Sequence, residues 1–302
     1  MKILLLGANG QVGHELRRSL APLGEVVATT RSGVLDDGLA CECADFDAPD
    51  ALAPLIERIA PDVVVNAAAY TAVDKAETER DAAFRANAEA PARIADACAA
   101  RDALLVHVST DYVFDGSGMR PYREDDPTAP LGVYGESKLA GEQGVRASGA
   151  RHMIFRTAWV YAAHGKNFLR TMLRLAAERD ELRVVADQRG TPTSAALIAD
   201  VVAIAIARPQ HANGLWHLTA GGETTWHGFA DAIVEGAHAR GLIARRPPVV
   251  PIAASDYPTP ARRPAYSVLD TAALRRTFEL VLPAWQDGMA ATLDALAHTS
   301  QH

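Results

Sequence analysis

Tyr134 and Lys138 are spaced so that they could act together in proton transfer. They lie four residues apart, so a helix would project both side chains from the same face. A free tyrosine has a pKa of about 10, and a neighbouring ammonium group can stabilise its phenolate enough for it to exchange a proton near neutral pH. The same ammonium group could bind the ribose of a nicotinamide cofactor. Because Tyr-x-x-x-Lys is a common spacing, the pair gains meaning only from the motifs around it.

Two of these motifs follow predicted buried strands. Ser109-Thr110-Asp111 comes at the end of an apolar run, and Asn66-Ala67-Ala68-Ala69-Tyr70-Thr71 comes at the end of the preceding one. Open α/β sheets bind ligands at the carboxyl ends of their strands. The Thr110 hydroxyl could hydrogen-bond a substrate oxygen and Tyr134, while the small alanines could let a nicotinamide lie against the backbone. Together these residues predict a Thr/Tyr/Lys site for carbonyl reduction.

A glycine-rich turn follows the first predicted strand. Gly7, Gly10 and Gly13 are spaced three residues apart, and the next helix is expected to begin near Gln11. Glycines permit a tight turn and a close approach of backbone N–H groups to a pyrophosphate, and the helix N-terminus adds partial positive charge. Strand, turn and helix together favour a dinucleotide site over a plain connecting turn.

The adenine end of such a cofactor is predicted less sharply. Arg31 follows the second strand, where it could pair with the 2′-phosphate of NADPH or be an ordinary solvated arginine. Asp36 or Asp37 could instead approach the ribose of NADH. Asp45 and Phe46 are placed to contact the adenine, or are a surface acid beside a core aromatic. NADPH is therefore favoured and NADH remains open.

The elements that must position these residues alternate in the pattern of βαβ units. Strands are expected at 2–6, 25–30, 61–67, 104–109 and 152–158, with helices at 11–22, 47–60, 74–101 and 133–149. Nearly continuous apolar strands indicate burial on both faces. The fold class is therefore α/β, a doubly wound Rossmann-type parallel sheet. We assign residues 1–158 to a cofactor-binding domain and 159–302 mainly to a smaller, interleaved substrate lobe, with about 182–225 returning to the sheet domain.

Helices in the second part are expected at 167–180, 195–207 and 226–240. Residues 245–264 contain six prolines, which excludes a central strand or a helix interior there.

Composition excludes several other classes of protein. The 302 residues carry a net charge of -7 without a long basic stretch, so nucleic acid and anionic membrane are not expected partners. The apolar run before Gly7 is too short for the core of a signal peptide or for a membrane span. Cys41, Cys43 and Cys98 are interpreted as reduced thiols, and no zinc spacing occurs. We expect a cytoplasmic protein without a bound structural metal.

At these motifs the chain resembles the dTDP-4-dehydrorhamnose reductases, which belong to the extended short-chain dehydrogenase/reductase type. The resemblance covers most of the chain, and its most specific parts are the runs 65–77 and 109–116. Further matching segments are 4–13, 134–142, 156–161, 167–168 and 262–264.

The resemblance implies hydride transfer from NADPH or NADH to C4 of dTDP-4-dehydro-β-L-rhamnose, the last step in making dTDP-β-L-rhamnose, a precursor of cell-wall polysaccharide and lipopolysaccharide. It implies that Tyr134 donates the proton, that Lys138 lowers the pKa of Tyr134, and that Thr110 positions the carbonyl. Asp111, Trp159 and Arg262 match substrate contacts. The implied cofactor-binding residues are Gly7, Gly10, Gln11, Val12, Gly13, Arg31, Asp45, Phe46, Ala69, Tyr70, Thr71, Tyr134 and Lys138.

Three alternatives stay open at this point. The first is a reductase for another dTDP-4-keto-6-deoxysugar. The second is a non-catalytic NADP-binding regulatory subunit, because a related fold supports methionine adenosyltransferase in that way. The third concerns assembly: family members that dimerise through magnesium carry glutamate where this chain has Ala196, so a monomer and a homodimer are both possible.

The helix expected over 74–101 carries Asn87, for which two roles are open. Its side chain could help to order a proton relay, or it could cap a distortion of the helix.

Overall fold

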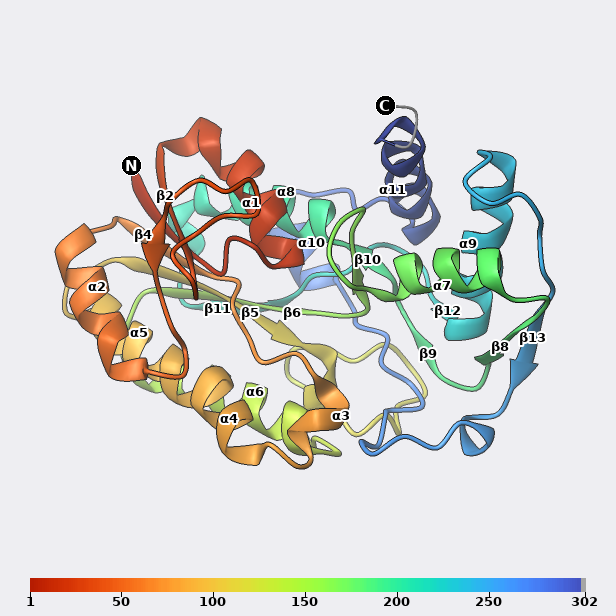
Figure 1. Cartoon of the computed structure of the whole chain (residues 1–302). Coiled ribbons are helices and arrows are strands. Elements are labelled where there is room, and N and C mark those ends of the chain that lie inside the picture. Colours follow the sequence, from red (N-terminus) through yellow and green to blue (C-terminus); the bar gives the residue numbers. More distant parts are fainter. Residues whose placement is uncertain (300–302) are drawn as a thin grey trace.

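Seven parallel strands form the central sheet of the protein (Figure 1). The computed structural model describes residues 1–299. In chain order the sheet grows outward from its first strand in both directions, which is the doubly wound arrangement. The predicted fold class is confirmed. From edge to edge the strands are β11 (Gly214–His217), β6 (His152–Thr157), β5 (Leu104–Thr110), β4 (Val63–Asn66), β1 (Lys2–Leu6), β2 (Glu25–Thr30) and β3 (Glu42–Cys43).

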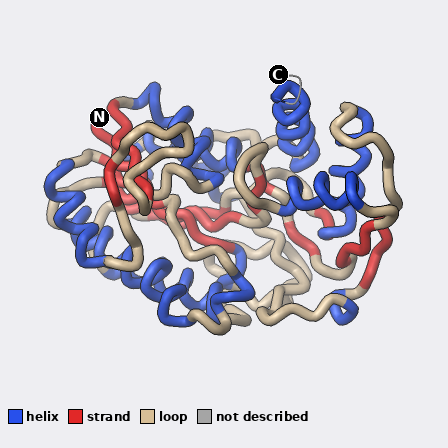
Figure 2. The backbone as a smooth tube through the Cα atoms, viewed as in Figure 1, coloured by secondary structure: helices blue, strands red, loops and turns tan. Residues whose placement is uncertain are grey.

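Helices cover both faces of the sheet (Figures 1 and 2). Side chains along a strand alternate between faces, so Ile3 and Leu5 enter one apolar core while Leu4 and Leu6 enter the other. All four are fully buried, which explains why the strand is apolar at each of these four positions. On the first face lie α1 (Gln11–Leu20), α8 (Ala195–Ile206) and α10 (Ala272–Phe278), and on the second lie α2 (Leu52–Ile59), α5 (Ala90–Ala99) and α6 (Val133–Ala147).

A smaller lobe is built around a separate apolar core beside the sheet (Figure 1). Its helices are α7 (Phe168–Glu178), α9 (Trp226–Ala239) and α11 (Trp285–Thr299). Since α8 and β11 return to the sheet between these helices, the lobe is interleaved with the sheet in sequence. Three two-stranded sheets complete it: β7 (Val160–Tyr161) with β10 (Thr193–Ser194), β8 (Leu182–Val185) with β13 (Val249–Ile252), and β9 (Arg189–Gly190) with β12 (Thr224–Thr225).

The single helix expected over 74–101 is broken into several pieces. It consists of α3 (Val73–Ala76), α4 (Arg80–Phe84), one π-helical turn over Arg85–Glu89, and α5. Pro91 has no N–H group with which to close the ordinary helical bond to the Asn87 carbonyl. The wider turn at Asn87 follows the loss of that bond, and it matters because the Asn87 side chain reaches the site described below.

A buried ion pair fixes α6 on the sheet. Arg156 on β6 donates from Nε and Nη2 to the two carboxylate oxygens of Glu142 on α6, at 2.9 and 2.7 Å. Both side chains are at most 4% exposed. The hydroxyl of Ser109 on β5 donates to the same carboxylate at 2.5 Å. The neighbouring strands β5 and β6 therefore both bind α6 at Glu142.

We expect Arg156→Met to destabilise the fold strongly. Glu142 would keep a buried charge without its partner, which typically costs about 3–5 kcal/mol in the free energy of unfolding. Urea denaturation measures the loss. The double variant Arg156→Met/Glu142→Leu should lose less than the single variant, since no charge stays buried. Equal losses in the two variants would contradict an anchoring role for the pair.

Candidate active site

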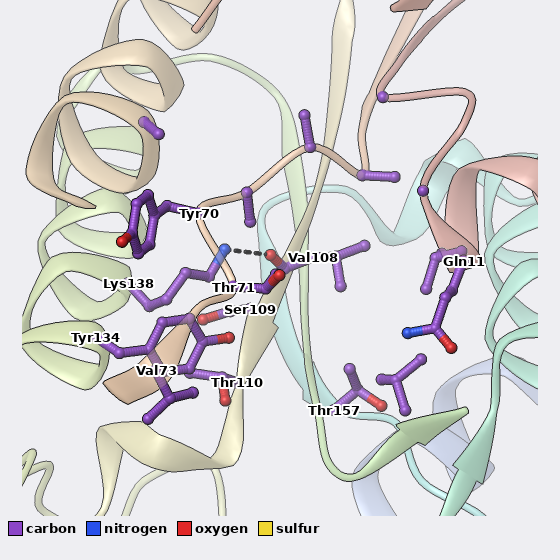
Figure 3. A pocket seen from close by; sticks show the side chains of 18 of the residues that line it. Gln11, Tyr70, Thr71, Val73, Val108, Ser109, Thr110, Tyr134, Lys138 and Thr157 are labelled. Carbon is purple, nitrogen blue, oxygen red and sulfur yellow. Dashed lines mark hydrogen bonds between the residues drawn. The ribbon is translucent and has the colours of Figure 1, made fainter. Parts of the chain in front are cut away.

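A cavity of about 750 Å³ opens at the carboxyl ends of β1, β4 and β5. Its walls come from the glycine turn before α1, the segment after β4, the end of β5 and the side of α6. Figure 3 shows Gln11 on one side of this cavity and Tyr70, Tyr134 and Lys138 on the other. The sheet's strand order changes direction between β1 and β4, so the cavity lies at the switch point where such sheets bind nucleotides.

The glycine turn has the shape of a phosphate cradle. Gly7 has φ +85°, a conformation that favours glycine, and a Cβ on Gly13 would lie 2.0 Å from the Gly7 carbonyl oxygen. Helix α1 has no side-chain cap and no acidic residue in its first turn. Its first N–H groups are therefore free to bind an anion. These features fit the pyrophosphate of a dinucleotide.

Lys138 is buried and held against the sheet. Its ammonium group donates to the Val108 carbonyl oxygen at 2.6 Å (Figure 3). Burial lowers the pKa of Lys138 to about 8, although the carboxylate of Glu142, one helical turn away, acts in the opposite direction. The side chain is thus a cation whose charge disappears not far above neutral pH.

The Tyr134 phenol lies beside the Thr110 hydroxyl at the end of β5 (Figure 3). Burial raises its pKa to about 12, while a hydrogen bond with Thr110 lowers it and the charge of Asp111 raises it. Burial of the phenol is the largest influence on this pKa, and the ammonium group of Lys138 donates to the Val108 carbonyl oxygen, so the expectation that Lys138 lowers the pKa of Tyr134 stays a prediction. Tyr134 is consequently a protonated phenol at neutral pH.

Asp111 adds a buried carboxylate next to this pair. Its Oδ1 accepts a hydrogen bond from Thr110 at 3.0 Å, and its Oδ2 is buried without a partner among the described residues. Burial raises the pKa of Asp111 to about 6, with the nearby hydroxyl groups of Ser267 and Thr110 acting in the opposite direction. An unpartnered oxygen here suits a hydroxyl group of a ligand.

Asn87 joins the loop after β4 to α6, the helix that carries Tyr134 and Lys138. Its side-chain oxygen accepts from the Tyr70 N–H at 2.8 Å, and its amide donates to the Tyr70 carbonyl and to the Ser137 hydroxyl, both at 3.0 Å. Ser137 in turn donates to the Tyr134 carbonyl at 2.8 Å. Of the two roles considered for Asn87, the structure bears on the second: Asn87 lies in the π-helical turn, and its side chain links Tyr70 to Ser137. A part in a proton relay stays a prediction.

Aromatic side chains form the wall opposite the sheet. Trp159 stacks on Trp226 with ring centroids 3.6 Å apart, and Phe168 packs against Trp226 at 4.7 Å. All three line the cavity. Trp159 has φ +48°, a conformation that costs a non-glycine residue energy, so the stack holds it there. The sequence singled out Trp159 alone; Trp226 lies 67 positions further along the chain, and no local pattern links the two.

Most of the residues predicted from the sequence do meet at this cavity. Gly13 lies beneath the turn, and Asp45 lies outside, with its carboxylate 3.6 Å from the Arg31 guanidinium group. Arg262 does not reach the cavity; it borders a separate small pocket behind Tyr112 and Tyr134. Those that line the main cavity are Gly7, Gly10, Gln11, Val12, Arg31, Phe46, Ala69, Tyr70, Thr71, Thr110, Asp111, Tyr134, Lys138 and Trp159.

The fold and the site together define a nucleotide-binding protein of the short-chain dehydrogenase/reductase class. More particularly, the chain belongs to the family described as the RmlD substrate binding domain, whose model matches residues 1–298.

Named relatives agree with this assignment. The chain is 49% identical to a dTDP-4-dehydrorhamnose reductase from Shigella flexneri, over 99% of both chains. A solved structure of a dTDP-4-dehydrorhamnose reductase from Bacillus anthracis in complex with NADP has a TM-score of 0.88 and 33% identity, covering 97% of this chain and 99% of that one. A probable dTDP-4,6-dihydroxy-2-methyloxan-3-one 4-ketoreductase from Streptomyces antibioticus is 40% identical over 96% of this chain and 93% of its own.

The pKa of Lys138 leads to a prediction about pH. Because burial lowers it from 10.5 to about 8, the ammonium charge is present below that pH and is lost as the pH rises through it. We expect kcat/KM for ketone reduction to fall above a pH of about 8, since this parameter reports groups of the free enzyme. A pH profile of kcat/KM measures this, and a profile that stays flat to pH 10 would contradict it.

Proposed function

We propose that this chain reduces the C4 ketone of dTDP-4-dehydro-β-L-rhamnose to give dTDP-β-L-rhamnose, the final step of dTDP-L-rhamnose synthesis. When bound, NADPH or NADH supplies the hydride from its nicotinamide ring. One observation carries the proposal: Tyr134, Thr110 and Lys138 converge on a cavity whose other side is a glycine turn at a helix N-terminus. The names of the relatives supply the identity of the sugar.

The residues of this chain have distinct tasks in the proposed reaction. Tyr134 donates its proton to the C4 oxygen, which it can do because burial keeps the phenol protonated and an alkoxide is a stronger base than a phenolate. Lys138 binds the nicotinamide ribose and stabilises the phenolate that remains. Asp111 accepts a sugar hydroxyl, and the indole of Trp159 offers an apolar face to the deoxysugar ring.

Another dTDP-4-keto-6-deoxysugar is the second candidate substrate. The relative from Streptomyces antibioticus is described as a probable 4-ketoreductase of a dTDP-linked dihydroxy-methyloxanone, and the Tyr134, Thr110 and Lys138 set would serve either ketone. Turnover of both ketosugars, compared at equal concentration, separates the two candidates. A non-catalytic regulatory subunit is disfavoured because the whole Thr110, Tyr134 and Lys138 set lines one cavity.

The cellular setting is also part of the proposal. No helix within residues 1–299 is long and apolar enough to cross a membrane, and Cys41, Cys43 and Cys98 are free thiols. Free thiols fit a reducing compartment, so we propose the cytoplasm. Within the described part of the chain, no group of His, Cys, Asp and Glu side chains is arranged to hold a metal, and a magnesium dependence is left to the assay below.

Replacing Tyr134 with Phe tests the proposed mechanism. With dTDP-4-dehydro-L-rhamnose and NADPH, the unaltered protein should consume NADPH, and Tyr134→Phe should lower kcat by roughly a hundredfold or more, the range of general acid catalysis. Loss of 340-nm absorbance measures turnover, with magnesium either added or chelated. NADPH affinity should change little. Near-normal turnover in this variant would remove Tyr134 from its role.

Arg31 is the proposed contact for the NADPH 2′-phosphate. Its guanidinium group borders the cavity, and the Asp45 and Asp47 carboxylates each lie 3.6 Å from it. Arg31→Ala should therefore raise KM for NADPH more than KM for NADH, because only NADPH loses a phosphate contact. Steady-state kinetics with both cofactors measures the ratio, and equal effects on both would refute the contact.

A further inference from the structure

Lys166 is a cation of the cavity wall that the reaction described above does not use. It lies in the loop between β7 and α7, next to Gly165 and Asn167, and all three residues line the cavity. Its side chain is exposed. Within residues 1–299 no carboxylate lies within ion-pair distance of its ammonium group, whereas Arg31 has two acidic neighbours and Lys138 is bound to a carbonyl.

The loop that carries Lys166 is fixed over the first turns of α1. His164 Nε2 lies 3.0 Å from a carboxylate oxygen of Glu15, and the His164 ring packs on the His14 ring at 4.0 Å. Both His14 and Glu15 belong to α1. A Cβ on Gly165 would lie 3.4 Å from Gln11 Cγ. The loop therefore meets α1 at the same end as the phosphate cradle.

The loop is held from its other side as well. The Asn167 amide donates to the carbonyl oxygens of Ala162 and His164, at 2.9 and 3.1 Å, and its side-chain oxygen caps α7 by accepting from the Arg170 N–H at 3.0 Å. Lys166 thus stands on a braced loop. A lysine held in this way loses less backbone entropy when it binds a ligand.

The ligands of the proposed function bring phosphate groups into this cavity, and a cation without a carboxylate partner is complementary to them. We propose that Lys166 binds a diphosphate group in the cavity, either the pyrophosphate of the nicotinamide cofactor or the diphosphate of the nucleotide sugar. The contact between Gly165 and Gln11 places Lys166 on the side of the glycine turn. This inference rests on the proposed function for the identity of its ligands.

Binding measurements on Lys166→Met and Lys166→Arg test the proposal without relying on turnover. We expect Lys166→Met to weaken the diphosphate ligand by roughly threefold to tenfold, the range for one exposed charged contact, and Lys166→Arg to stay within about twofold of the unaltered protein. The difference should shrink at high salt. Lys2→Met is the matched control, because Lys2 begins β1 at the opposite end of that strand from the cavity.

Three probes distinguish the two diphosphates. Fluorescence titration gives Kd for NADPH and for NADH, and calorimetry gives Kd for dTDP. Equal weakening of NADPH and NADH assigns Lys166 to the cofactor pyrophosphate, and weakening of dTDP alone assigns it to the sugar nucleotide. Unchanged affinities for all three ligands overturn the proposal, as does weakening of NADPH alone, which would indicate the 2′-phosphate.

Failure of the proposed function would look different. An unaltered protein that binds NADPH and dTDP but does not reduce dTDP-4-dehydro-L-rhamnose would defeat the proposed reaction. The affinities measured for the Lys166 variants would still decide whether this lysine binds a diphosphate.

Discussion

The position of α6 on the sheet is the constraint on which the site depends, and the buried pair of Arg156 and Glu142 sets it. Glu142 is one helical turn from Lys138, which is one turn from Tyr134. Close backbone approach reinforces the same register: a Cβ on Gly135 would lie 2.2 Å from the Tyr112 carbonyl oxygen, and a Cβ on Gly141 2.1 Å from that of Asn87. A buried ion pair adds little net stability, but it permits only one arrangement of helix and strand.

The burial of Tyr134 and Lys138 on α6 also decides the protonation of these two candidate catalytic side chains. Desolvation disfavours whichever form is charged, so it raises the pKa of Tyr134 and lowers that of Lys138. The two pKa values, which start at 10.0 and 10.5, therefore move apart, to about 12 for Tyr134 and about 8 for Lys138. A protonated phenol beside an ammonium group suits the proposed reduction, because that reaction begins with a proton on the tyrosine and leaves a phenolate that the ammonium charge stabilises.

The sequence predicted the parts of this structure that local patterns encode. Buried strands, the turn at Gly7 to Gly13 and the Tyr134/Lys138 spacing all follow from periodicity and glycine geometry. Other features depend on partners far apart in the sequence: the stack joins Trp159 to Trp226, 67 positions away. Arg262 lies outside the cavity, because a proline-rich tract has no regular periodicity from which to place its side chains. To predict the π-helical turn at Asn87, the missing N–H group of Pro91 would have to be weighed against the strong helical pattern of residues 74–101. The raised pKa of Tyr134 comes from burial of its side chain, which the spacing of Tyr134 and Lys138 does not reveal.

The hydrogen-bond direction at Thr110 limits what this residue can do for catalysis. With a pKa of about 6, Asp111 is mainly ionised at neutral pH and can only accept, so the Thr110 proton points toward it. The Tyr112 N–H donates to the same hydroxyl at 3.2 Å. While the Thr110 proton is donated to Asp111, it is not available to a substrate carbonyl. In the proposed reaction, the proton that neutralises the developing alkoxide would then come from Tyr134 alone.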